Sequence, residues 1–199
     1  MKDDVKNIIF VGTGGQGIVS ASRILAWSLF KSGYEVKASE IHGMAQRGGT
    51  VFGFLRFGKK VNSPQIPKGT GDLMIALEEM EALRYLPYLK EGALVILNRK
   101  RVIPSSLDPA QYPQDVVDRL QKKGYRVIEV FAEERSKVLG SSKVENVFLL
   151  GVVSPLLPIK EDVWKEIISR FFPKKVVDLN IKAFDDGRKL GEELFQSQN

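Results

Sequence analysis

Two glycine-rich segments hold most of the groups that could do chemistry. The first, Gly12–Gly17 (GTGGQG), follows the apolar run Ile8–Val11 and precedes a stretch with helical periodicity. In a strand–turn–helix context such glycines permit a tight turn, close approach of the backbone to a phosphate, and helix–strand packing. The helix N-terminus adds unpaired N–H donors and the positive end of its dipole. The pattern therefore favours an anion-binding turn, although a tight turn without a ligand has the same spacing. Its glycines are Gly12, Gly14, Gly15 and Gly17.

The second segment is Glu40–Gly49 (EIHGMAQRGG), in which three of ten residues are glycine. A loop of this composition is costly to order in chain entropy. It also collects a carboxylate, an imidazole, an amide and a guanidinium, whereas a bland connector would use Ser, Asn, Asp and Pro. Functional groups concentrate on loops held by a rigid scaffold, so we interpret this segment as functional.

The composition excludes several classes of site. The 199 residues include no cysteine and one histidine, His42, so disulfides, thiolate metal sites, cysteine nucleophiles, Cys-ligated iron–sulfur clusters and multi-histidine metal sites are excluded in this chain. The net charge of +6 is scattered, and nothing resembles a nucleic-acid motif. The densest basic stretch, Arg99–Arg101, is interpreted as a solvated loop. No apolar run approaches the ~18 residues of a membrane span and no signal peptide is evident, so we expect a cytoplasmic protein.

Strands alternate with helices along the chain, which predicts a single α/β domain over residues 1–199. The expected strands are Val5–Val11, Tyr34–Ser39, Thr50–Phe57, Asp72–Leu77, Ala93–Asn98 and Tyr125–Val130. The expected helices are Gln16–Ser32, Glu78–Leu89, Pro113–Lys123, Ala132–Leu139, Asn146–Leu157, Glu161–Phe172 and Val176–Leu194, of which those from about residue 146 pack on the rest.

These elements predict a doubly wound, Rossmann-like, mainly parallel sheet, with its first two strands as a parallel pair. An antiparallel edge is expected around Thr50–Val61, where Gly58–Lys60 forms a hairpin turn and Val61 starts a short return strand. In such sheets ligands lie at the carboxyl ends of the strands. Both glycine-rich segments follow strands and emerge on that edge. A shared anion-binding site is therefore geometrically plausible.

The two motifs together resemble a known family. GTGGQG before a helix, SEIHGMAQRGG before a strand, and NIKAFDDG at Asn180–Gly187 are similar to the gamma-type domain of the 2-oxoacid:ferredoxin oxidoreductases, and HGMAQRGG is most similar to the indolepyruvate type. The resemblance implies a heteromeric enzyme that oxidatively decarboxylates aryl-2-oxoacids to acyl-CoA and reduces ferredoxin. It also implies that a large (alpha) subunit carries thiamine diphosphate and the iron–sulfur clusters, and that this chain binds no cofactor alone.

Coenzyme A is the ligand we expect at Gly12–Gly17, because the resemblance places the gamma-type domain on the coenzyme A side of the active site. Gln16 is a candidate hydrogen-bond donor to a phosphate or to the partner, and Arg47 a candidate for bidentate binding of phosphate or carboxylate. His42 is the candidate catalytic residue, as a donor or proton carrier near neutral pH. An equal alternative is that His42 and Gln46 only pin the loop through backbone hydrogen bonds. The further cofactor-binding candidates are Gln46, Gly48 and Gly49, and no metal site is expected.

Two other functions remain open. In an NAD(P)-dependent dehydrogenase, Glu40 would hold a ribose near the end of the second strand, but no Tyr-x-x-x-Lys pair follows. The other alternative is a non-catalytic nucleotide-binding module that works without a large subunit.

Overall fold

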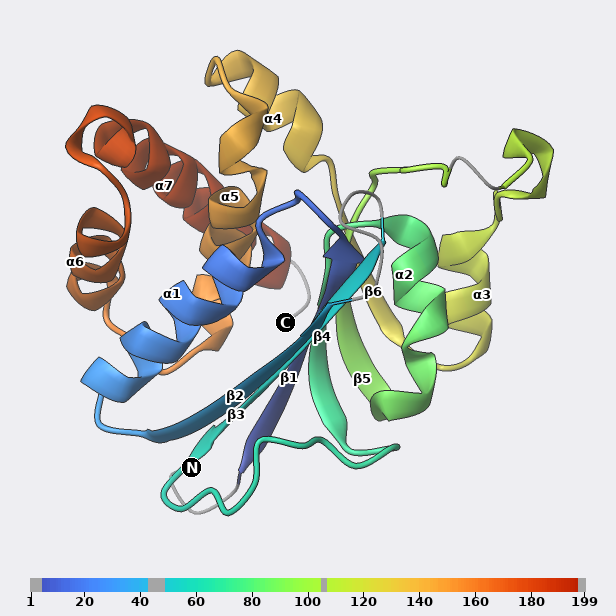
Figure 1. Ribbon diagram of the computed structural model, residues 1–199, viewed down its shortest axis with the longest axis horizontal. Helices are drawn as coiled ribbons and strands as arrows, with labels where there is room; N and C mark the ends of the chain where they lie inside the picture. Colours follow the sequence, from blue (N-terminus) through green and yellow to red (C-terminus); the bar gives the residue numbers. More distant parts are fainter. Residues whose placement is uncertain (1–4, 43–48, 105–106, 197–199) are drawn as a thin grey trace.

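The computed structural model describes residues 5–42, 49–104 and 107–196, and its centre is one six-stranded sheet (Figure 1). The strand order is β2-β3-β1-β4-β5-β6. The strands are β1 (Lys6–Thr13), β2 (Glu35–His42), β3 (Thr50–Gly58), β4 (Gly71–Ala76), β5 (Leu89–Asn98) and β6 (Arg126–Val130). Strands β1, β4, β5 and β6 pair in parallel, while β3 runs antiparallel to both β1 and β2. The mainly parallel sheet expected from the sequence is confirmed.

The placement of the antiparallel strand differs from the expectation. Strand β3 lies inside the sheet, with Phe10 opposite Gly53 on one side and Glu40 opposite Gly53 on the other. Strands β1 and β2 therefore run in the same direction but are not a pair, and β2 forms the edge. The return strand expected at Val61 is also wrong, because residues 59–70 contain no strand. A parallel neighbour needs a crossover of a dozen or more residues, and the connection 43–49 between β2 and β3 is shorter, so these strands form a hairpin.

Helices cover both faces of the sheet (Figure 1). They are α1 (Ile18–Lys31), α2 (Glu79–Arg84), α3 (Val116–Lys122), α4 (Ala132–Val138), α5 (Glu145–Val153), α6 (Glu161–Phe171) and α7 (Lys174–Gln196). Single 3₁₀ turns occur at Leu86–Tyr88, Pro109–Gln111, Ser142–Val144 and Ser154–Leu156. Helices α1, α5, α6 and α7 lie on one face, and α2 and α3 lie on the other. The doubly wound α/β arrangement follows from this coverage.

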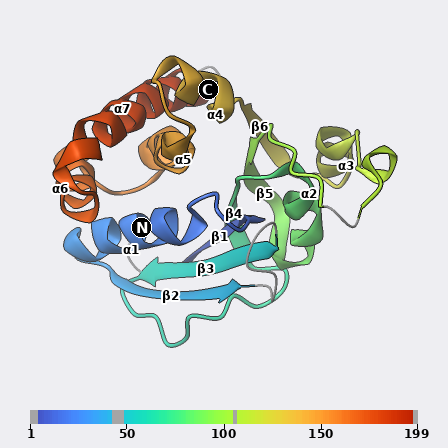
Figure 2. The ribbon, with the colours of Figure 1, turned by 45° about the horizontal axis from the view of Figure 1, so that its top comes forward.

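Helix α5 is the centre of the larger core. All nine of its residues are buried, and Figure 2 shows it enclosed by α1, α4, α6 and α7. A helix that is apolar all round needs such an enclosure. Its contact with α7 is backbone to backbone: a Cβ added at Gly187 would lie 2.1 Å from the Phe148 carbonyl oxygen, and one added at Gly151 would lie 2.2 Å from the Phe184 carbonyl oxygen. Only glycine fits at these two positions.

The helix boundaries agree with the expected ones to within three residues except in α2 and α5. The helix expected over Asn146–Leu157 ends at Val153, where the 3₁₀ turn Ser154–Leu156 with Pro155 follows. The expected helix Glu78–Leu89 ends at Arg84, and Leu86–Tyr88 forms a 3₁₀ turn. Pro87 explains the early end, because a proline has no N–H to donate to the carbonyl four residues earlier and its ring would clash with that carbonyl. Within the described residues, no helix is both long and apolar enough to cross a membrane.

Candidate functional site

The Gly12–Gly17 loop leaves the carboxyl end of β1 and begins α1 at Ile18, as the sequence predicted. Gln16 fixes its shape. Its side-chain Oε1 accepts a hydrogen bond from the Thr13 N–H at 2.8 Å, and its Nε2 donates to the Leu77 carbonyl after β4 at 3.2 Å. Both ends of the amide are thus engaged within the chain, so Gln16 shapes the loop. Direct donation from Gln16 to a ligand stays a prediction.

Two asparagines extend this pattern of amide contacts along the same edge. Asn98, at the end of β5, donates from Nδ2 to the Leu77 carbonyl at 3.2 Å and accepts the Ala132 N–H at 3.1 Å. Asn146 of α5 donates from Nδ2 to the Gly17 carbonyl at 3.1 Å. The loops after β1, β4, β5 and β6 are therefore tied to one another and to α5. This edge is a preorganised platform.

Helix α1 starts without a side-chain cap. Gly17 is its N-cap residue, with a φ of 76°, and the first turn contains no acidic residue. The first N–H groups of a helix have no intrahelical acceptor, and the dipole is positive at this end. A Cβ at Gly17 would lie 2.5 Å from Asn146 Nδ2, whereas a Cβ at Gly15 would meet no atom within 4 Å. The loop is closely packed at Gly17 and open at Gly15.

A cavity of about 210 Å³ opens at this helix N-terminus. It is lined by Gly15, Gln16, Gly17, Lys100, Ser142, Lys143, Glu145 and Asn146. Lys100 Nζ lies 2.8 Å from both carboxylate oxygens of Glu145. Lys143 is exposed and, within the described part of the chain, has no carboxylate partner. The cavity thus combines a positive helix end, one neutralised ion pair and one unpaired ammonium, which suits an anion.

Only part of the second glycine-rich segment is described. The Gly49 carbonyl accepts the Gly14 N–H at 2.8 Å, so the two segments meet at this point. Gln46, Arg47 and Gly48 lie outside the described residues. His42 is placed only by its backbone, which pairs with Val51 in the β2–β3 hairpin. The roles of these four residues stay predictions.

The position of β3 weighs against the dehydrogenase alternative. Glu40 lies on β2, and one whole strand separates β2 from β1. At a strand spacing of about 4.8 Å, that puts β2 roughly 10 Å from the glycine loop's strand. Glu40 instead faces Arg23 of α1, with its Oε1 3.7 Å from Arg23 Nε. Glu40 therefore does not provide a ribose-binding carboxylate beside the Gly12–Gly17 loop.

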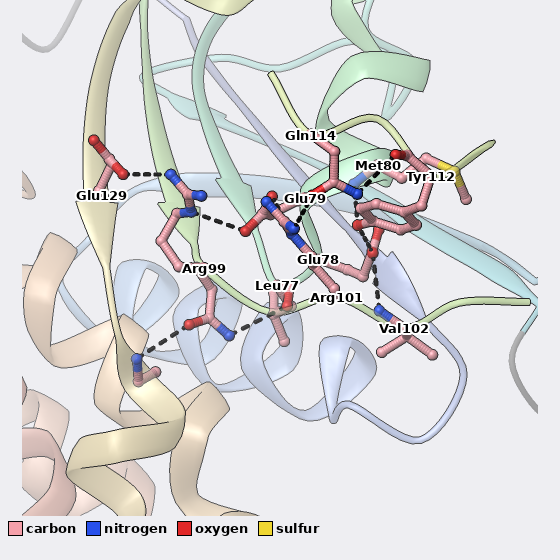
Figure 3. A network of polar contacts seen from close by, with 12 residues as sticks. Leu77, Glu78, Glu79, Met80, Arg99, Arg101, Val102, Tyr112, Gln114 and Glu129 are labelled. Atoms are coloured by element: carbon pink, nitrogen blue, oxygen red, sulfur yellow. Dashed lines mark hydrogen bonds and ion pairs between the residues drawn. The ribbon is translucent and has the colours of Figure 1, made fainter. Parts of the chain in front are cut away.

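Three buried glutamates, Glu78, Glu79 and Glu81, follow β4, and the first two belong to the polar network drawn in Figure 3. Glu78 caps α2 by accepting the Glu81 N–H at 2.9 Å; it also accepts the Val102 N–H at 3.1 Å and the Tyr112 hydroxyl. Burial, followed by this hydrogen bond, raises the pKa of Tyr112 far above its ordinary value. Glu78 therefore ties the segments after β4 and β5 together.

Glu79 holds two arginines at once. Its Oε1 lies 2.8 Å from Arg99 Nε and its Oε2 lies 3.1 Å from Arg101 Nε. The side chain of Glu79 is 2% exposed, and those of Arg99 and Arg101 are 22% and 35% exposed. Arg99–Arg101 is a loop, as expected, but its cations are not simply solvated, because all three pair with carboxylates, Lys100 with Glu145.

Of the three glutamates, Glu81 has the fewest hydrogen-bond and ion-pair partners for its carboxylate. Its Oε1 accepts Thr50 Oγ1 at 3.2 Å and pairs with Arg84, while its buried Oε2 has no partner among the described atoms. Burial raises the pKa of this carboxyl, and Arg84 opposes the shift. Thr50 follows the second glycine-rich segment directly, so Glu81 adjoins that segment's end.

Sequence reasoning identified the glycine loop but missed the residues that hold it in place. Asn98 and Asn146 carry no local signature, since each acts through a partner far away in the sequence. Glu78, Glu79 and Glu81 begin an expected helix, where acidic side chains are favourable against the helix dipole, and this local pattern indicates no partner for them. The signal that could have revealed their partners is the basic stretch Arg99–Arg101, which follows the next parallel strand, because side chains at the carboxyl ends of neighbouring strands meet.

Comparison with known proteins places this fold. The family model for pyruvate ferredoxin/flavodoxin oxidoreductase matches residues 7–190. Indolepyruvate oxidoreductase subunit IorB of Thermococcus kodakarensis is 37% identical, over 94% of this chain and 96% of its own length. IorB of Archaeoglobus fulgidus is 41% identical, over 91% and 92%.

A solved structure shares the same fold. It is the 2-oxoglutarate:ferredoxin oxidoreductase of Magnetococcus marinus with 2-oxoglutarate, coenzyme A and succinyl-CoA bound, with a TM-score of 0.75 and 22% identity. The match covers 96% of this chain and 32% of that chain. With a family model that matches residues 7–190 and relatives matched over more than nine tenths of both lengths, this chain belongs to the pyruvate ferredoxin/flavodoxin oxidoreductase family.

Proposed function

We propose that this chain is the small subunit of an indolepyruvate-type 2-oxoacid:ferredoxin oxidoreductase, and that it contributes the wall of the active site facing coenzyme A. The assignment is supported by family membership and by relatives named indolepyruvate oxidoreductase subunit over nearly their whole length. The enzyme oxidatively decarboxylates an aryl-2-oxoacid to the acyl-CoA and passes the electrons to ferredoxin.

The redox cofactors belong to the partner in this proposal. None of the 199 residues is cysteine, so the chain does not fit an iron–sulfur cluster held by thiolates. We assign thiamine diphosphate and the clusters to the large subunit, which also meets ferredoxin. The role of this chain is then to bind and orient, and the chemistry that the cofactors supply takes place on the other polypeptide.

The uncapped start of α1 and the cavity beside it are the observation that carries the coenzyme A assignment. Pockets for whole drug-sized ligands are about 300–1,000 Å³, so a cavity of about 210 Å³ takes a phosphate group rather than all of coenzyme A. The helix N–H groups and Lys143 would bind that phosphate. The rest of the molecule then extends toward the large subunit, which fits a ligand shared between two chains. The Magnetococcus marinus enzyme, solved with coenzyme A bound, supports the choice of ligand.

Lys143→Gln tests the anion site in the assembled complex. Removing an exposed ammonium close to a phosphate should raise the KM for coenzyme A by about two- to five-fold and leave kcat unchanged. Lys182→Gln is the matched control, because Lys182 is also exposed but lies on α7. Equal KM values for both variants and the unmodified complex would show that the phosphate of coenzyme A does not bind in this cavity.

The subunit assignment is tested separately by isolating the chain from its native source. We expect it to co-purify in a fixed ratio with a polypeptide that contains thiamine diphosphate and iron–sulfur clusters. Isolation of the chain alone, still able to bind its ligand, would favour a self-sufficient nucleotide-binding module instead.

A further inference from the structure

A second and larger cavity lies at the opposite edge of the sheet. It has a volume of about 510 Å³ and is bounded by the starts of β1 and β4, the end of β3 and the turn after α5. Lys6 and Thr13 are the first and last residues of β1, so the two edges are about 23 Å apart at 3.3 Å per residue. This cavity is therefore separate from the one at the glycine loop.

Its walls are apolar and partly aromatic. Tyr34 and Phe57 meet edge to face, with ring centroids 5.4 Å apart, and the other walls include Ile8, Leu94 and Pro155. Leu156 is 41% exposed at the rim, so the cavity opens to the surface. Its volume lies within the range of small-molecule sites, which are mostly apolar with a few polar groups that fix orientation.

The charged side chains at the rim favour a ligand with a negative charge. Asp72 is already satisfied, because it accepts the Asn7 N–H at 2.8 Å and pairs with Lys90 at 2.5 Å. Lys6 is exposed and lines the same cavity, and the described part of the chain gives it no ion-pair partner. Among the described residues that line the cavity, Lys6 is thus an ammonium without an ion-pair partner, beside an apolar, aromatic interior.

We propose that this cavity binds an aromatic monocarboxylate, with its ring among Tyr34, Phe57 and Leu94 and its carboxylate at Lys6. A ring gains from edge contacts with the two aromatic side chains, and the carboxylate stays at the solvent-exposed rim where its desolvation cost is small. The proposal does not rest on the proposed function, because it uses none of the residues at the glycine-loop edge.

The full chain is titrated with 4-fluorophenylacetate and the ligand is observed by ¹⁹F NMR. We expect saturable binding with a Kd below about 1 mM. The uncharged isostere 4-fluorophenylacetamide should bind about two- to five-fold more weakly, and Lys6→Gln should weaken binding of the acid by a similar factor without affecting the amide. Leu156→Asp places a carboxylate at the partly exposed rim and should weaken acid binding by about two- to five-fold more than it weakens amide binding.

Lys123→Gln is the control, since Lys123 is an exposed lysine at the end of α3, on the other face of the sheet. Circular dichroism melting verifies that every variant is folded. Absence of saturable binding, equal affinity for acid and amide, or equal effects of Lys6→Gln and Lys123→Gln would each overturn the proposal.

Discussion

Glu79→Gln should destabilise the chain far more than an ordinary surface substitution. The change keeps the size of the side chain, so it opens no cavity. One oxygen remains to accept from Arg99, but the other position becomes an amide donor facing the Arg101 guanidinium, which itself only donates. Two positive charges are then left close together without their shared anion.

The magnitude follows from the exposure of the three side chains. Removing one member of a buried ion pair costs about 3–5 kcal/mol. Arg99 and Arg101 keep 22% and 35% of their side-chain exposure, so solvent screens part of the cost. We therefore expect a loss of about 2–3 kcal/mol in the free energy of unfolding. For a chain of this size that is a decrease of roughly 4–12 °C in Tm.

Urea unfolding followed by circular dichroism measures this loss. Glu129→Gln is the matched control: Glu129 also pairs with Arg99, but its side chain is 40% exposed, so its loss should stay below about 1 kcal/mol. Adding Arg101→Gln to Glu79→Gln should cost less than the sum of the two single losses. A Glu79→Gln protein within about 0.5 kcal/mol of the unmodified chain, or a control that costs as much, would refute the reasoning.

Three further predictions follow from the packing and the polar contacts. Gly187→Ala should lower the free energy of unfolding by at least about 2 kcal/mol in thermal unfolding, because its Cβ would overlap the Phe148 carbonyl. The control Lys189→Ala, on the same helix, should change it by less than about 0.5 kcal/mol. Similar values for the two variants would contradict the backbone contact of α5 and α7. Burial raises the pKa of Glu81 above its ordinary 4.5, so ionisation of this carboxyl lowers the stability of the fold as pH rises above 4.5. Glu81→Gln should therefore be more stable than the unmodified chain by roughly 1 kcal/mol at pH 7, and the gain should vanish below about pH 4.5. A gain that does not change with pH would contradict ionisation of Glu81 as its cause. Gln16→Ala removes the contacts to Thr13 and Leu77 and should cost about 1–2 kcal/mol and speed hydrogen exchange of the Thr13 amide; unchanged exchange would show that Gln16 does not fix the loop.

The elements around the glycine loop were predictable from the sequence because their signals are local. An apolar run ending in glycines marks β1 and the turn, and the helical spacing after Gly17 marks α1. Most of the helix expected over Asn146–Leu157 is also present, as α5. These patterns report burial and backbone geometry of neighbouring residues, which a short window of sequence contains.

The order of the strands was harder to predict, because it depends on pairing between distant segments. No residue of Thr50–Phe57 indicates by itself that β3 inserts between β1 and β2. The 43–49 connection is too short for a parallel crossover, so its length indicates an antiparallel β2–β3 pair but not which of the two strands pairs with β1.

The charged network could not be derived from local sequence for a similar reason. Glutamates at a helix start and an arginine-rich stretch after a strand are each typical of solvated surface. They become a buried network only because β4 and β5 are parallel neighbours whose carboxyl ends coincide. Burial of Glu79 is tolerable because two guanidinium groups reach it from the next loop.

The central claim is that this chain completes, with a large subunit, an enzyme that transfers an acyl group to coenzyme A. The most direct measurement is the rate of ferredoxin reduction by the purified large subunit, with an arylpyruvate and coenzyme A, in the absence and presence of this chain. We predict that each polypeptide alone is nearly inactive and that mixing them restores activity that depends on both substrates. Full activity of the large subunit without this chain would contradict the claim.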